Sequence, residues 1–433
     1  MSSAMIGIIG FAVVLLLILL FKFPIGFSMI LVGVAGIAYL TSIETAFGAL
    51  GGQIFSASAS YDMAVVAMFI LMGEMAFATG ISDKAYESAF KWLGRLRGGL
   101  TMATIGACAA FAAVCGSSPA TAATVGSIAL PEMKKYGYDD EIATGSIAAG
   151  GVLGILIPPS MGFILLGLLT EQSISKLYMA GIVPGILLAV LFMLAAYIVA
   201  TIRPQGAEVP PVSFREKVIS LKGFLEVIII FVVVIGGMFF GLFTPTEAGA
   251  VGVVAIICAS LIRRNFTWQI LWHCLQQSTI MAGMIIVIFI GAKIFSYFLA
   301  ASTLPFQLGE MIGNLPLPPI MIIGAILLLW LVLGCLMDAI AMIMLTVPII
   351  YPIVCQLGFD PVWFCVLGVL AIEAGLITPP VGMNVYVIAG VAKGVPVHTI
   401  FRGIVPFFIA IFVCIAIIMA IPGVALFLPN ILY

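Results

Sequence analysis

Uninterrupted apolar runs of about 17 to 25 residues recur along the whole chain, and they constrain its fold more than any other feature. The N-terminal run, MSSAMIGIIGFAVVLLLILLFK, is one of them. Each run is long enough to cross the hydrocarbon core of a bilayer, about 30 Å thick, as an α-helix. Hydrophobic residues make up 64% of the 433 residues and charged residues only 8%, a composition far from that of soluble proteins. We therefore expect an all-α polytopic membrane protein surrounded by lipid. With no long basic tail, it should have no nucleic-acid partner.

An internal repeat organises these runs. One constant shift of the sequence against itself aligns landmarks spread over much of each half of the chain. The aligned pairs include Pro24 and Pro245, Pro131 and Pro352, Gly154 and Gly375, and the dipeptides Pro158-Pro159 and Pro379-Pro380. A constant register with matching neighbours predicts two homologous halves, residues 1–203 and 224–433, joined by a polar linker at 204–223.

The basic residues predict that the two halves are inverted. Cytoplasmic loops of membrane proteins retain lysine and arginine. If the N-terminus lies outside, 15 of the 17 basic residues fall in the cytoplasm, with Lys176 outside and Lys293 within a span. The linker is then cytoplasmic and both termini are periplasmic. Each half should contain about five spans.

Each half should also contain one re-entrant helical hairpin and one broken helix. The apolar pieces within 100–131 and 320–352 are too short to cross singly, so we expect hairpins there. The Pro-Pro pairs should break the helices at 142–170 and 362–391. Free carbonyls at such breaks suit a small hard cation, and a half-helix N-terminus suits a carboxylate. The alternative is that the prolines only kink packing helices.

Four segments resemble the large membrane subunit of the tripartite ATP-independent periplasmic (TRAP) transporters, in the ion transporter superfamily. They are GSSPATAATVGSIALPEMKKYGYD, GILIPPS, GCLMDAIAMIMLTVPIIYPIVCQLGFD and GLITPPVGMN. The resemblance implies an elevator-type, sodium-coupled uptake system in the bacterial inner membrane. It also implies two partners, a small four-helix membrane subunit and a periplasmic substrate-binding protein. Because the chain starts at the first span of the first repeat, we expect the small subunit as a separate chain.

The resemblance implies two sites for Na⁺ as the transported coupling ion. The first would use Cys115, Ser117, Gly154, Ile157 and Pro158. The second would use Gly334, Gly375, Thr378 and Val381, with the Thr378 hydroxyl as its one side-chain ligand. Ile157 stands where the second half has Thr378, so the first site should rely more on the backbone.

The expected substrate-binding residues lie at the hairpin tips and beside the breaks. They are Ser117, Ser118, Pro159, Ser160, Asp338, Pro380 and Asn384.

Five polar or charged residues in the predicted spans and hairpin tips are open to two interpretations, since such groups are costly in a membrane and usually functional. Asp338 either contacts a cation or substrate, or caps the hairpin helix. Glu74 and Lys293 either face the small subunit or pair internally. Glu373 either stabilises the second break or faces a water-filled gap, and Asn384 either binds substrate or makes a helix–helix contact.

The sequence gives no sign of an enzyme. An intramembrane metalloprotease needs a His-Glu-x-x-His cluster, but His273 and His398 stand far apart along the chain. No Walker motif is present. We expect sodium-coupled uptake of a carboxylate-containing organic anion, such as a C4-dicarboxylate, sialic acid or sugar acid. The alternative is a stand-alone sodium- or proton-coupled anion carrier, or a channel, of the same fold.

Overall fold

The computed structural model describes residues 2–207 and 210–432, and in these ranges the chain forms helices and no β-strand. Six of the described helices are long and apolar enough to cross a membrane, or eight if each of two bent helix pairs counts as one span. The expectation of an all-α polytopic membrane protein is confirmed. The predicted periplasmic ends, Met1 and Tyr433, and linker residues 208–209 lie outside the described residues.

The first half contains eleven of the described helices. They are α1 (Ser3–Leu19), α2 (Ile25–Leu40), α3 (Ile43–Ser58), α4 (Met63–Ala78), α5 (Ile81–Leu93), α6 (Gly99–Cys115), α7 (Ser118–Lys135), α8 (Asp140–Gly151), α9 (Leu153–Leu156), α10 (Met161–Thr170) and α11 (Ile174–Ile202).

The second half follows a similar order. Its described helices are α12 (Phe214–Phe231), a π-helical turn η1 (Val232–Gly236), α13 (Gly237–Phe239), α14 (Pro245–Arg263), α15 (Trp268–Ala301), α16 (Leu304–Gly313), α17 (Pro319–Gly334), α18 (Ala339–Gln356), α19 (Pro361–Leu376), α20 (Met383–Val391), α21 (Val397–Ala420) and α22 (Gly423–Leu432). Helices α7 and α18 are both 18 residues long and begin at positions that the repeat aligns. Helices α8 and α19 also begin at aligned positions. The inversion of the halves stays a prediction.

Two elements differ from the sequence analysis. Residues 43–58, for which the sequence analysis names no element, form α3, which meets α4 at a bend of 49°. The counterpart of this pair in the second half is the single 34-residue helix α15. The second part of the predicted linker belongs to α12, which starts at a capping box formed by Ser213 and Glu216.

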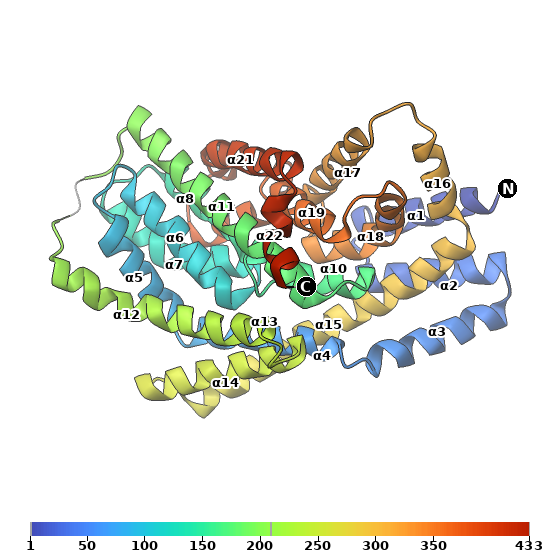
Figure 1. Ribbon diagram of the computed structural model, residues 1–433, viewed down its shortest axis with the longest axis horizontal. Coiled ribbons are helices and arrows are strands. Elements are labelled where there is room, and N and C mark those ends of the chain that lie inside the picture. The colour runs from blue at the N-terminus through green and yellow to red at the C-terminus, as the bar shows by residue number, and fades with distance from the viewer. Residues whose placement is uncertain (1, 208–209, 433) are drawn as a thin grey trace.

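The described helices gather into two bundles (Figure 1). In the first, called here the α2–α15 bundle, α2 and α4 of the first half pack against α15, and α4 also packs against α14. In the second, called the hairpin bundle, α6 packs on α7 and α17 on α18, and α8 packs on α21. Both bundles contain extensive contacts between elements of opposite halves, so neither half forms a separate domain.

Helices α5 and α16 each precede a hairpin and connect the two bundles. Gly80, at a φ of 67°, directly precedes α5, and Gly98, at a φ of 69°, directly precedes α6, so the chain turns sharply before each of these two helices. Helix α5 packs on α6 and on α12, where the Trp92 indole N–H donates to the Lys217 carbonyl at 3.1 Å. Helix α16 packs on α18 and α1.

Candidate functional site

The two hairpin tips begin their second helices in the same way. Ser117 is the N-cap of α7, and its hydroxyl accepts from the Ala120 N–H at 3.5 Å. Asp338, its counterpart in the repeat, is the N-cap of α18 and accepts from the Ala341 N–H at 3.0 Å. The capping interpretation of Asp338 therefore describes its contact in this structure.

Each Pro-Pro pair separates two helices. The first lies between α9 and α10, and helices α8–α9 and α10 meet there at 40°. Ser160 begins α10 as its N-cap, accepting from the Phe163 N–H at 3.3 Å, while its hydroxyl donates to the Ile155 carbonyl. The second pair lies between α19 and α20. Both Pro-Pro peptide bonds are cis.

In both halves the broken helix is hydrogen-bonded to the hairpin tip through the main chain. The Met161 N–H, two residues after the first Pro-Pro pair, donates to the Gly116 carbonyl at 3.2 Å. The Val381 N–H, directly after the second pair, donates to the Cys335 carbonyl at 3.2 Å. Each half thus contributes one unit built from a hairpin tip and a helix break.

The first predicted sodium site brings Ser117 and Gly154 into contact. A β-carbon on Gly154 would lie 2.5 Å from both the Ser117 carbonyl oxygen and the Thr121 hydroxyl oxygen. The Cys115 thiol lies 4.0 Å from the same Ser117 carbonyl. Thr121 was missed by the sequence analysis, although it lies one helical turn after Ser117. Among the described residues, its buried hydroxyl has no hydrogen-bond partner, and it lies beside Gly154 of the predicted site.

The second predicted sodium site brings Gly334 and Gly375 together. A β-carbon on Gly375 would lie 2.7 Å from the Gly334 Cα. The Thr378 hydroxyl donates to the Ala374 carbonyl at 2.6 Å, and its oxygen keeps lone pairs for a cation. Val381, also predicted here, is 43% exposed.

The two breaks differ in access. Pro158, Pro159 and Ser160 are buried, whereas Pro380 and Val381 are exposed. Of the predicted substrate-binding residues, Pro380 is therefore open to solvent or lipid in this conformation, and Pro159 and Ser160 are enclosed.

Three polar residues form a fully buried cluster between the halves: Ser118, Glu373 and Asn384, each 0% exposed. The Ser118 hydroxyl lies 2.6 Å from Glu373 Oε2, and Asn384 Nδ2 donates to Ser118 Oγ at 2.8 Å. The helix–helix interpretation of Asn384 describes these contacts. Glu373 packs within protein and not in an open gap.

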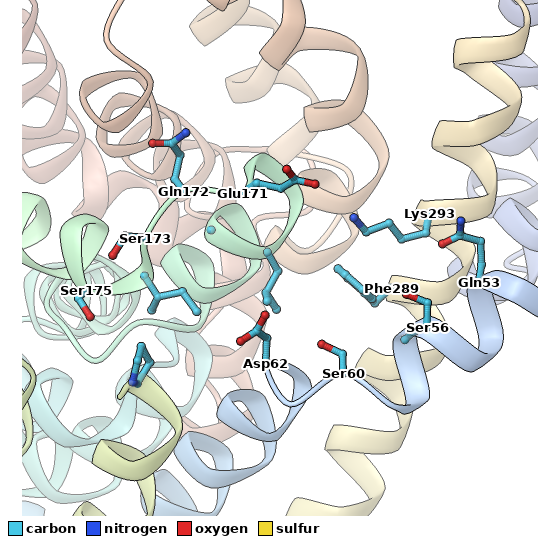
Figure 2. A pocket seen from close by; sticks show the side chains of 15 residues that line it. Gln53, Ser56, Ser60, Asp62, Glu171, Gln172, Ser173, Ser175, Phe289 and Lys293 are labelled. Carbon is cyan, nitrogen blue, oxygen red and sulfur yellow. The ribbon is translucent and has the colours of Figure 1, made fainter. Parts of the chain in front are cut away.

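A cavity of about 710 Å³ lies elsewhere, between the α3–α4 bend, α15 and the α10–α11 turn. Figure 2 shows Lys293 of α15 and Glu171 of the turn on opposite walls, with Gln53 and Ser56 of α3 beside Lys293. The Lys293 ammonium lies 5.4 Å from the centre of the Phe289 ring. Lys293 therefore faces polar space between the two bundles. Glu74, on α4, is half-buried.

Residues 12–424 match the family model of the tripartite ATP-independent periplasmic transporter, DctM component. The chain belongs to this TRAP transporter family. Among its relatives, the C4-dicarboxylate TRAP transporter large permease protein DctM of Pseudomonas aeruginosa is 36% identical over 87% of this chain and 88% of that protein. The sialic acid TRAP transporter large permease protein SiaM of Vibrio cholerae is 30% identical over 94% of this chain and 95% of its own length.

A solved structure shares the fold of this TRAP permease. The YdaH transporter of Alcanivorax borkumensis superimposes with a TM-score of 0.63, covering 88% of each chain at 15% sequence identity. The family and its permease relatives identify a multi-pass membrane transporter, which supports a role in transport and not in catalysis.

Proposed function

We propose that this chain is the large permease subunit of a sodium-coupled system that takes up a carboxylate-containing organic anion. The observation that carries the proposal is the paired tip-and-break unit. In each half, a hairpin tip is hydrogen-bonded through its main chain to a Pro-Pro break. Backbone carbonyls held at such breaks are the ligands that Na⁺ prefers, and the repeated arrangement supports two ion sites.

The names of the relatives support the substrate class. They are described as permeases for C4-dicarboxylates and sialic acid, both of which carry carboxylates. Only Lys293 and Lys176 lie outside the basic cytoplasmic segments of the predicted topology, so the hairpin bundle offers little fixed positive charge to a carboxylate. Two bound sodium ions and the N-termini of α10 and α20 would supply it.

The same proposal includes the partners and the movement. The family name describes a tripartite periplasmic system, which supports a small membrane subunit and a periplasmic substrate-binding protein as partners in the inner membrane. The hairpins and breaks lie together in one bundle that α5 and α16 connect to the other. This arrangement supports an elevator, in which the hairpin bundle moves against the α2–α15 bundle.

The decisive experiment is uptake of a labelled organic anion into liposomes containing the chain and its two partners, measured over a range of inward sodium gradients. The native chain is compared with Thr378→Val, which removes the predicted side-chain ligand. We expect the sodium concentration for half-maximal uptake to rise on the order of tenfold, because losing about 1.4 kcal/mol of binding changes affinity tenfold.

Thr279→Val is the matched control. Thr279 makes the same kind of bond to the carbonyl four residues earlier, at 2.7 Å, on an exposed part of α15. Loss of the Thr279 hydroxyl should leave the sodium concentration for half-maximal uptake unchanged. Uptake that does not depend on sodium in the native chain, Thr378→Val or Thr279→Val would overturn the proposal. It would point to a proton-coupled carrier or a channel of this fold.

A further inference from the structure

The buried cluster of Ser118, Glu373 and Asn384 joins the two halves at one point. Ser118 is the first residue of α7, Glu373 lies near the end of α19, and Asn384 lies at the start of α20. Among the described polar and charged side chains that are buried, Glu373 is the one carboxylate. A carboxyl group is placed so deeply only when specific partners hold it.

The hydrogen bonds of this cluster have a fixed direction. Asn384 Nδ2 donates to Ser118 Oγ, so the single hydroxyl proton of Ser118 goes to Glu373 Oε2. Asn384 also lies near α8, since its Nδ2 is 3.5 Å from the Ala148 carbonyl. Glu373 Oε1 and Asn384 Oδ1 have no hydrogen-bond partner in the described part of the chain. Ser118 is therefore the link on which the orientation of both other side chains depends.

Ser118 and Glu373 each lie beside a different predicted ion site. Ser118 follows Ser117, whose carbonyl belongs to the first site. Glu373 precedes Gly375 of the second site by two residues. The Ser118–Glu373 bond, 2.6 Å long, is thus a direct connection between the hairpin tip of one site and the helix break of the other.

The internal repeat does not duplicate this cluster. In the register of the repeat, Ser118 corresponds to Ala339, Glu373 to Val152 and Asn384 to Phe163. All three counterparts are apolar and buried. The first hairpin tip is therefore joined to the second break by polar side chains, whereas the counterpart positions at the second tip and the first break are apolar. The repeat alone does not explain this cluster.

We propose that the Ser118–Glu373 hydrogen bond couples the two sodium sites, so that an ion bound at one site raises the affinity of the other. The inference rests on the proposed function. Turning the Ser117 carbonyl toward an ion shifts Ser118, and Ser118 transmits the shift to the α19 helix end that carries Gly375. Ser118 and Glu373 are positioning residues, because their side chains act through the ligands next to them.

The test measures sodium binding without transport. The full-length purified chain is titrated with sodium at constant ionic strength, with choline as the replacement cation, and sodium-dependent thermal stabilisation is recorded. For two coupled sites, the Hill coefficient of the native chain should approach about two. It should fall to about one in Ser118→Ala and Glu373→Ala. Glu373→Gln, which retains an acceptor for the Ser118 hydroxyl, should restore the native Hill coefficient.

Ser146→Ala is the matched control, because Ser146 is also fully buried and its hydroxyl bond, 3.0 Å to the Ala143 carbonyl, stays within α8. A purely structural role for Ser118 would lower the melting temperature without sodium and leave the Hill coefficient unchanged. If Ser118→Ala does not fold, Ser118→Cys takes its place, since a thiol of similar size is a weaker donor and should lower the coefficient.

The outcomes separate the two proposals. No sodium response in the native chain would overturn the proposed function. A native chain that responds to sodium with a Hill coefficient of about one would overturn the coupling. A Hill coefficient that is the same in the Ser118 and Glu373 variants as in the native chain would also overturn it. Both results would leave sodium-driven uptake standing.

Discussion

At the residue scale, the second predicted ion site depends on two glycines that leave no room for a side chain. Gly334 ends α17 and Gly375 lies in the last turn of α19. β-Carbons added there would lie 3.0 Å and 2.7 Å from the Cα of the other glycine. The contact involves backbone on both sides, so the two helices must separate to accept a methyl group.

We predict that Gly375→Ala destabilises the chain by about 1–3 kcal/mol, the usual cost of overpacking, and lowers the melting temperature in detergent. Gly324→Ala, in the middle of α17, is the control. No atom of another described element lies within 4 Å of its β-carbon position, so this substitution should be neutral or stabilising. Equal melting temperatures for the two variants would contradict the close helix approach.

The sequence placed both glycines in one predicted ion site, through the repeat and the family resemblance. It did not indicate that their backbones touch, because the whole of α18 lies between them in the chain and the contact depends on how α17 packs on α19.

At the scale of elements, the helices that lead into the breaks start at aspartate caps. Asp139 accepts from the Glu141 N–H at 3.2 Å, at the start of α8. Asp360 accepts from the N–H groups of Val362 and Trp363, at 2.8 and 3.0 Å, at the start of α19. The repeat aligns these two aspartates with each other, so it preserves the cap as well as the break.

We predict that Asp360→Ala lowers stability by about 1 kcal/mol, because two N–H groups of the first turn lose their acceptor. Asp62→Ala tests the specificity of this effect, since Asp62 precedes α4 but makes no capping hydrogen bond with its side chain. Thermal unfolding of both variants against the native chain provides the measurement. A loss of stability as large in Asp62→Ala would argue against the cap.

At the scale of the whole molecule, the predicted inversion of the halves would place equivalent loops on opposite sides of the membrane. Leu96, between α5 and α6, and Leu317, between α16 and α17, are aligned by the repeat. They are similarly exposed, at 48% and 45%. This similar exposure makes them a matched pair for labelling.

We predict that a membrane-impermeant maleimide labels Leu317→Cys in intact spheroplasts but labels Leu96→Cys only after permeabilisation. The physical reason is the positive-inside rule, since Arg95 and Arg97 flank Leu96 whereas the segment around Leu317 has no basic residue. Both variants are made in a chain whose exposed cysteines, Cys258 and Cys355, are replaced by serine. Labelling of both positions from the same side would show that the halves are parallel.

The sequence by itself determined the membrane class, the family and the places where helices break. These properties depend on local chemistry, because long apolar runs place the chain in lipid, and a proline removes a backbone N–H donor and so determines where a helix breaks. The tertiary structure alone decided that α3 is helical and bends against α4, that Thr121 lies beside Gly154, and that Ser118 of the first half meets Glu373 of the second. Such contacts depend on which helix faces pack together, and no period or spacing along one chain contains that information.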